Sequence, residues 1–229
     1  MIKRRIAAMD SVRGIAVCMM VAHHLLYDCV MLLGAPAWLY RNPVFDVLHY
    51  FFSIVFISVS GIASQFSRSN LKRGAILCVI AVLMSVVTGL IGMQIRFGVL
   101  HLLGFCIVFY ALTRRIWDTI PKKLAPILYI ALAILTAALT RIRVKAKFLW
   151  MFGFMYDGFH SADYFPIFPW LFVFLLGTWM GYYVKRGYLP RSLYRTKPGF
   201  FAAVGRRSLL IYLAHQPVLY GIVYLLSLL

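Results

Sequence analysis

The stretch VAHHLLYD, residues 21–28, places two histidines and an aspartate inside the first apolar run of the chain. Ionisable side chains are costly within a membrane-spanning helix and usually mark function there. His24 and Asp28 are four residues apart, so a helix presents both on one face, where the carboxylate can hold one imidazole nitrogen and make the other more basic. The alternative is a structural role, in which both side chains hydrogen-bond to neighbouring helices. His23 lies about 100° around the helix and is expected to be structural.

Further polar residues are expected at the same depth, in the outer half of the membrane. Asp46 and His49, at i and i+3, form a second candidate pair, and His101 and His215 lie in later apolar runs. Since separate helices place their polar residues independently, a shared depth indicates a shared cavity. Histidine is a common ligand of zinc and iron, but the chain has no H-x-x-x-H or H-E-x-x-H pattern and no glutamate, so we expect no metal.

Composition identifies an all-α integral membrane protein. Of the 229 residues 63% are hydrophobic and the mean hydropathy is +0.86, whereas soluble domains are about 45–50% apolar. We expect one integral-membrane domain over residues 1–229. The 24 basic residues outnumber the 6 acidic ones, but they lie between apolar runs, as topology signals do, which argues against nucleic-acid binding. The four cysteines lie far apart and show neither disulfide nor zinc spacing.

Seven apolar runs are candidates for membrane spans. They cover about residues 10–33, 44–65, 73–93, 97–114, 124–140, 167–185 and 203–227. The first run follows a basic N-terminus, as in a signal peptide, but it continues to about Leu33 without a clear A-x-A cleavage site, so we expect it to be retained. The sequence therefore predicts a polytopic transmembrane helix bundle of about seven spans.

The basic residues between these spans predict the orientation of the chain. Seventeen of them, including Lys3, Arg4 and Arg5, fall on one side and six on the other, which puts the N-terminus in the cytoplasm and the C-terminus outside. The stretch TRIRVKAKF, residues 140–148, opposes the rule with four cations on the outer side. Either this loop is an exception, which could serve an anionic acceptor, or the fifth span is wrong and the topology changes there.

Five stretches in order carry a resemblance that covers nearly the whole chain. They are MDSVRGIAVCMMVAHHLLYD, FISVSGIASQFS, RFGVLHLLG, DYFPIFPWLFVFLLGTWMGYY and GRRSLLIYLAHQPVL. Together they resemble bacterial members of the heparan-alpha-glucosaminide N-acetyltransferase catalytic-domain-like family, within a wider class of transmembrane acyltransferases. In that class an R-G-I-A run is followed by a histidine eleven residues after the arginine, and Arg13 and His24 have this interval. The resemblance therefore implies that His24, not His23, is the catalytic candidate.

One family feature is missing. The animal lysosomal enzyme of the family carries its reactive histidine in the loop after the first span, in an H-x-x-W-type context. The matching region here, GAPAWLYRNPVFD, contains Trp38 and Asp46 but no histidine. We therefore expect no transfer through an acyl-histidine in this loop, and the amino-sugar substrate of that enzyme does not follow for this chain.

The resemblance implies transfer of an acyl group, often acetyl, from acyl-CoA to a sugar-type acceptor. His24 would be the general base, and Asp28 would orient it and stabilise its imidazolium, as in other histidine–carboxylate dyads. His101 or His215 would donate a hydrogen bond to the carbonyl oxyanion. Binding of the acceptor is expected from four residues of the outer side, namely Asp46, His49, Arg96 and Asp163.

The donor is expected at the cytoplasmic side. Arg13, with Lys72 and Arg73, would hold the phosphates of acetyl-CoA or another acyl-CoA, because arginine presents a planar fork to phosphate. The alternative for Arg13 is an ion pair with Asp10 that anchors the end of the helix.

The expected partners are membrane lipid, acyl-CoA and a carbohydrate or glycolipid acceptor, in a multi-pass protein of the bacterial cytoplasmic membrane. The rival interpretation is a proton-coupled transporter or lipid-handling protein that uses the same histidines and aspartates as a proton relay. A non-catalytic subunit that keeps the fold is a third alternative. The sequence leaves the oligomeric state open, a homo-oligomer included.

Overall fold

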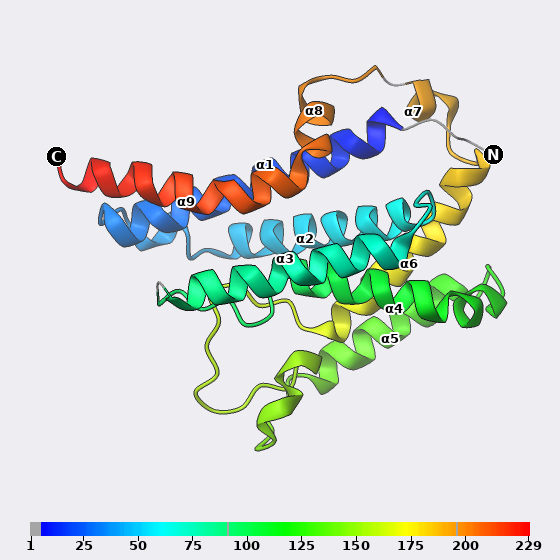
Figure 1. Cartoon of the computed structure of the whole chain (residues 1–229), viewed down its shortest axis with the longest axis horizontal. Coiled ribbons are helices and arrows are strands. Elements are labelled where there is room, and N and C mark those ends of the chain that lie inside the picture. Colours follow the sequence, from blue (N-terminus) through cyan, green and yellow to red (C-terminus); the bar gives the residue numbers. More distant parts are fainter. Residues whose placement is uncertain (1–5, 91, 196) are drawn as a thin grey trace. The chain divides into compact units, whose positions relative to one another are not determined.

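The computed structural model describes residues 6–90, 92–195 and 197–229 (Figure 1). Lys3, Arg4 and Arg5, which contribute to the predicted orientation, lie outside these residues. The described chain is helical and contains no β-strand, which confirms the predicted all-α class. Its long helices are α1 (Ala7–Leu32), α2 (Pro43–Ser64), α3 (Asn70–Leu90), α4 (Val99–Thr119), α5 (Ala125–Leu139), α6 (Ile167–Arg186) and α9 (Ser208–Ser227). The short ones are η1 (Ala37–Leu39), η2 (Lys147–Phe152), α7 (Arg191–Arg195) and α8 (Phe200–Arg206).

Six helices in the described part of the chain are long and apolar enough to cross a membrane. They are α1, η1 with α2, α3, α4, α6 and α9, and they match six of the seven predicted spans. The remaining predicted span, 124–140, forms α5, which has 15 residues. At 1.5 Å per residue a helix of this length falls short of a hydrocarbon core about 30 Å thick. The chain is therefore a helical, multi-pass membrane protein, with six helices of spanning length in its described part.

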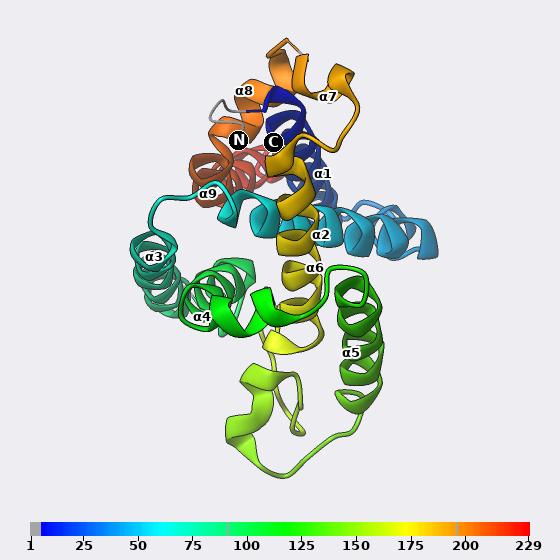
Figure 2. The same ribbon diagram turned by 90° about the vertical axis from the view of Figure 1, so that its right-hand side faces the viewer.

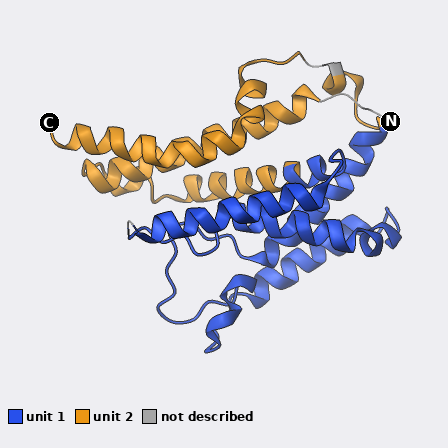
Figure 3. Cartoon of the chain, viewed as in Figure 1, with its two compact units in different colours: residues 1, 60–186 blue, residues 2–59, 187–229 orange. Residues whose placement is uncertain are grey.

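The chain divides into two compact units (Figure 3). Unit 1 contains residues 60–186 and unit 2 contains residues 2–59 and 187–229, so that α2 begins in unit 2 and ends in unit 1. The expectation of one domain over residues 1–229 stays a prediction.

In unit 1, α3 packs against α4 and α5 packs against α6 (Figure 2). Small residues let the first pair approach closely. A Cβ atom on Gly104 would lie 2.7 Å from the sulfur of Cys78, and one on Gly74 would lie 2.7 Å from the side chain of Val108. Interfaces rich in small residues are typical of membrane helices, because the backbones themselves supply the van der Waals contact.

The loop between α5 and α6 folds over the start of α4, also within unit 1. The amide of Ala162 donates to the carbonyl of Gln94 over 3.1 Å, and the amide of Phe165 donates to that of Phe97 over 2.8 Å. These bonds form a short parallel bridge between Phe97 and Tyr164. The loop thereby fixes the segment that leads into α4.

In unit 2, α1 packs against α8 and α9 (Figure 1). Two glycines allow the contact with α8. A Cβ atom on Gly14 would collide with the carbonyl oxygen of Phe201, and a Cβ atom on Gly205 would collide with that of Asp10. Because both obstacles are backbone atoms, this crossing requires glycine at both positions.

The start of α2 is set by its first residues. Asn42 accepts hydrogen bonds from the amides of Val44 and Phe45, over 3.0 and 3.1 Å, and Pro43 occupies the first helical position. Asparagine before a helix and proline at its first position are typical N-terminal signals. This start places His49 in the second turn of α2.

Candidate active site

Four histidines of unit 2 gather where α1, α2 and α9 meet. The ring centroids of His24 and His215 are 4.9 Å apart, and those of His23 and His49 are 4.8 Å apart. The two pairs are linked through the neighbouring residues His23 and His24, whose centroids are 6.0 Å apart. We call these four residues the histidine cluster. The expectation that histidines from separate spans lie close together therefore holds for these four residues of unit 2.

His24 and Asp28 are connected through a third residue, Gln216 of α9. The amide nitrogen of Gln216 donates to the two carboxylate oxygens of Asp28, over 3.0 and 3.2 Å. Its amide oxygen lies 3.0 Å from Nδ1 of His24. Only 1% of Asp28 is exposed, so its carboxylate needs this partner inside the unit. The predicted dyad thus takes the form of a chain of three side chains.

This chain determines the protonation pattern of His24. An ionised carboxylate only accepts hydrogen bonds, so the NH₂ group of Gln216 must face Asp28 and its oxygen must face His24. That oxygen also only accepts, so Nδ1 of His24 carries the hydrogen. In the neutral ring Nε2 then holds the lone pair. His24 is therefore held in the tautomer that a general base requires.

His215 is held in the same tautomer by a different contact. Its Nδ1 lies 2.7 Å from the backbone carbonyl oxygen of Tyr212, which can only accept, so Nδ1 is the donor. Nε2 of His215 is buried and has no hydrogen-bond partner among the described residues. Buried polar atoms are normally paired, and an unpaired one beside a second basic nitrogen indicates a place for a polar ligand. His24 and His215 together offer two basic nitrogens to such a ligand.

The second pair of the histidine cluster, His23 and His49, lies beside tyrosine rings. The ring of His23 lies 4.9 Å from that of Tyr40, which in turn lies 5.1 Å from that of Tyr27. His23 therefore faces His49 and Tyr40, whereas His24 faces α9. This agrees with the expected difference in direction between the two neighbours. Asp46, expected to pair with His49, is exposed in the first turn of α2.

His101 belongs to unit 1 and has a different environment. Its Nδ1 accepts a hydrogen bond from the amide of Gly98 over 3.2 Å, which closes the first turn of α4. Its Nε2 lies 3.0 Å from the hydroxyl oxygen of Ser85, whose own hydrogen is donated to the carbonyl of Ile95. Both ring nitrogens are thus occupied by unit 1 itself. The catalytic role of His101 stays a prediction, and its contacts are those of a residue that caps a helix.

This geometry gives a test that separates the two roles of His101. We expect His101→Ala to lower the free energy of unfolding by about 1 kcal/mol, the usual cost of losing a helix cap. Turnover per folded molecule should fall less than tenfold. Thermal melts and activity assays would be compared with those of His160→Ala, since His160 is exposed in the loop between α5 and α6. An unchanged melt with lost turnover would establish the catalytic role instead.

Arg96 and Asp163, two of the predicted acceptor-binding residues, come together in unit 1. Asp163 accepts a hydrogen bond from the amide of Val99 over 3.1 Å, at the start of α4. Arg96 donates to the hydroxyl oxygen of Tyr156 over 2.6 Å. Nearby, the hydroxyl of Tyr164 donates to the carbonyl of Trp150 over 2.6 Å, and burial raises the pKa of Tyr164 to about 12.

These contacts order the segment before α4 and the loop between α5 and α6 in unit 1. The other two acceptor-binding candidates, Asp46 and His49, belong to unit 2.

A family comparison covers the same residues. The model of the family "Heparan-alpha-glucosaminide N-acetyltransferase, catalytic" matches residues 5–217, which is most of the chain. The chain belongs to this family. No curated protein and no solved structure matches it. The suspected resemblance is thereby confirmed, and the protein is a member of a membrane N-acetyltransferase-like family.

The matched range includes the whole histidine cluster of this N-acetyltransferase family member. Gln216 is its last residue but one. Gln216 was not among the candidates from the sequence, although an uncharged amide beside His215 in an apolar run is itself unusual. Its partner on α1 is 188 residues away along the chain, so only the packing of α1 against α9 reveals the contact.

The predicted donor-binding residues of this family member fall in both units. Arg13 belongs to α1 of unit 2, while Lys72 and Arg73 lie in the first turn of α3 in unit 1. A terminal nitrogen of Arg73 lies 3.5 Å from the hydroxyl of Ser60, and Lys72 is exposed. Their joint action on one donor stays a prediction. Among the described residues, no group of three or more histidine, cysteine, aspartate or glutamate side chains is arranged to hold a metal ion.

Proposed function

We propose that this family member transfers an acyl group, in the first instance acetyl, from acyl-CoA to a hydroxyl or amine of a carbohydrate or glycolipid. The observation that carries the proposal is the buried chain from Asp28 through Gln216 to His24. It holds an imidazole in one tautomer with its basic nitrogen available. General acid–base catalysis needs such a group within hydrogen-bond reach of the acceptor.

The chemistry follows from this arrangement. Nε2 of His24 takes the proton from the acceptor as its oxygen or nitrogen attacks the thioester carbonyl. The tetrahedral intermediate collapses, the carbon–sulfur bond breaks, and the imidazolium of His24 gives its proton to the departing thiolate. The products are the acylated acceptor and CoA with a free thiol, and His24 returns to its starting form. The charge of Asp28 stabilises the imidazolium while Gln216 keeps the ring in place.

His215 acts beside His24 in this proposal. In the neutral tautomer described above its Nε2 accepts a hydrogen bond, so it orients the acceptor hydroxyl or amine rather than the oxyanion. The oxyanion role expected from the sequence requires His215 in its protonated form, since only then does Nε2 donate. Asp46, His49, Arg96 and Asp163 are retained as proposed acceptor-binding residues.

The experiment that tests the function uses purified protein in lipid nanodiscs with radiolabelled acetyl-CoA and a panel of sugar and glycolipid acceptors. Label in an acceptor, with release of free CoA thiol, supports the proposal. The rival function is tested with the same preparation in liposomes. Proton-coupled uptake of a solute without acyl transfer would contradict the transferase and favour a transporter.

The donor site gives a separate prediction. Arg13→Lys keeps the charge but loses the planar fork that holds phosphate at two points, so we expect acetyl-CoA to bind about tenfold more weakly. Isothermal calorimetry on folded protein measures the affinity. Arg41→Lys is the matched control, because Arg41 is exposed and lies on the opposite side in the predicted topology. An unchanged affinity in Arg13→Lys would remove Arg13 from the donor site.

A further inference from the structure

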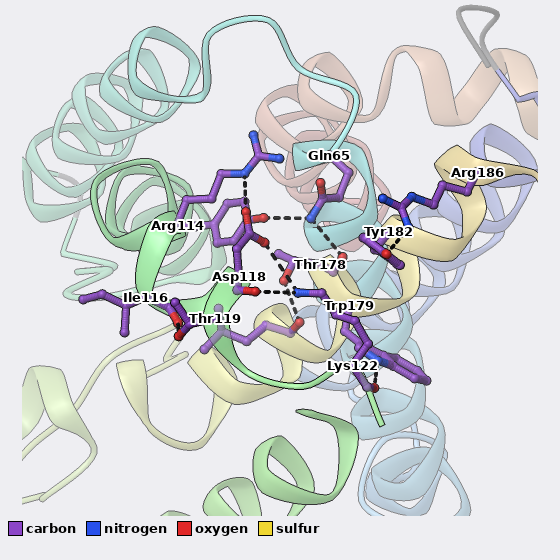
Figure 4. Close-up of polar contacts among 12 residues, drawn as sticks. Gln65, Arg114, Ile116, Asp118, Thr119, Lys122, Thr178, Trp179, Tyr182 and Arg186 are labelled. Carbon is purple, nitrogen blue, oxygen red and sulfur yellow. Dashed lines mark hydrogen bonds and ion pairs between the residues drawn. The ribbon is translucent and has the colours of Figure 1, made fainter. Parts of the chain in front are cut away.

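Unit 1 contains a polar pocket that none of the predicted site residues lines. It lies where α2, α4 and α6 end and α5 begins, and Figure 4 shows its polar contacts. Its empty volume is about 270 Å³, part of it open to solvent. Its wall contains both aromatic and polar side chains, among them Gln65, Tyr110, Trp117, Lys122, Trp179 and Tyr182. Tryptophan and tyrosine are enriched where a helix meets the membrane surface, so this wall fits the interface.

Cations outnumber acids around this pocket. Arg114 and Lys122 share one carboxylate, that of Asp118, at 3.2 and 3.7 Å. Lys185 donates to the backbone carbonyl of Gln65 over 2.6 Å, and Arg186 lies over the ring of Tyr182, with its carbon Cζ 3.9 Å from the centroid. These last two partners are neutral. Four cations and one carboxylate therefore leave an excess of positive charge around the pocket, and Figure 4 labels three of these cations, Arg114, Lys122 and Arg186, together with Asp118.

Lys122 is the cation that the structure holds most directly at the pocket. Its backbone carbonyl accepts a hydrogen bond from the indole of Trp179 over 2.8 Å, which ties the segment before α5 to α6. Its ammonium lies 5.3 Å from the centroid of the Tyr182 ring and 3.7 Å from Asp118. A lysine fixed in this way at the pocket wall needs little reordering to receive an anion.

We propose that this pocket binds the phosphate group of a phosphate ester, such as the headgroup of an anionic phospholipid. Basic pockets between membrane helices on the cytoplasmic side are recognised as sites for such headgroups. The predicted orientation puts Arg114, Lys122 and Lys185 on that side.

The test uses the full chain and two sources of phosphate. Native mass spectrometry would count the phosphatidylglycerol molecules that the protein retains when released from nanodiscs of phosphatidylcholine and phosphatidylglycerol in equal parts. Glycerol 3-phosphate, added to protein in phosphatidylcholine alone, is the soluble source, and its binding is read from the thermal melt. We expect Lys122→Gln and Arg114→Gln each to weaken retention about fivefold, the effect of removing one cation near a membrane phosphate.

The neighbouring cations supply matched controls. Lys123→Gln and Arg115→Gln remove the same charge one residue away, from side chains that neither line the pocket nor form one of the ion pairs with its Asp118 described above. A lipid bound by the wild type and both controls, and lost in the two pocket variants, supports the site with a lipid as its source. The same pattern with glycerol 3-phosphate supports the site with a soluble ester. Equal losses in pocket and control variants, or no bound ester in either arm, would overturn the proposal, provided that melts in phosphatidylcholine show each variant folded.

Discussion

Replacing His24 with alanine should remove nearly all acyl transfer while the protein stays folded. General acid–base catalysis contributes about 10²–10⁴-fold, and in the proposed mechanism His24 serves both as base toward the acceptor and as acid toward the thiolate, so we expect a loss of at least about 10³-fold in kcat. The measurement is turnover with a defined acyl-CoA and acceptor, alongside a thermal melt.

His23→Ala is the matched control, because it removes the same side chain from the next position of the same helix. His23 contacts His49 and Tyr40 instead of Gln216, so its loss should lower turnover much less. If His24→Ala keeps wild-type turnover, the chain of three side chains is structural. His49, His101 and His215 would then be the remaining candidates for the base.

Asp28→Asn should give a large but partial loss, on the order of 10²-fold in kcat. The asparagine oxygen still accepts a hydrogen bond from Gln216, so the position of His24 is kept, but the charge that stabilises its imidazolium is gone. Asparagine is a suitable replacement because it is similar in size to aspartate. Only 1% of this residue is exposed, so the site has no room for a larger side chain. The measurement is kcat with a defined acyl-CoA and acceptor, alongside a thermal melt that shows the variant folded.

Gln216→Leu tests the middle of the hydrogen-bonded series, because it removes the link between Asp28 and His24 and leaves both of those residues unchanged. Residues that act as a unit are not additive, so the double variants of Gln216→Leu or Asp28→Asn with His24→Ala should be little worse than His24→Ala alone. Additive losses would show that Asp28 and Gln216 act independently of His24. Because Gln216→Leu leaves Asp28 buried without its donor, its thermal melt should fall more than that of Asp28→Asn.

The long helices could be predicted from the sequence because apolar runs of about twenty residues have few alternatives in a membrane. The run at 124–140 shows the limit of this reasoning. Its composition is as apolar as that of the others, but Pro121 and Pro126 confine the helix start, and Thr140 ends it after 15 residues. The paired contacts between Gln94, Phe97 and the loop at 162–165 depend on tertiary packing and leave no periodic signal.

The candidate site could be predicted only in part. The i, i+4 spacing of His24 and Asp28 correctly puts them on one face, but spacing within a helix says nothing about a residue that another helix inserts between them. Gln216 enters from α9 for that reason. His101 was selected for its depth alone, whereas its contacts with Gly98 and Ser85 depend on how α3 packs against α4.

The glutamine between Asp28 and His24 has a consequence for where protons can travel. A carboxamide donates and accepts hydrogen bonds but does not give up its hydrogen at physiological pH, so it acts as an insulator in a proton wire. A proton on His24 therefore cannot reach Asp28 through Gln216, and in the proposed mechanism it leaves through the reacting molecules. A proton relay along these three side chains would be interrupted at the amide, so this arrangement favours the transferase over the proton-relay alternative.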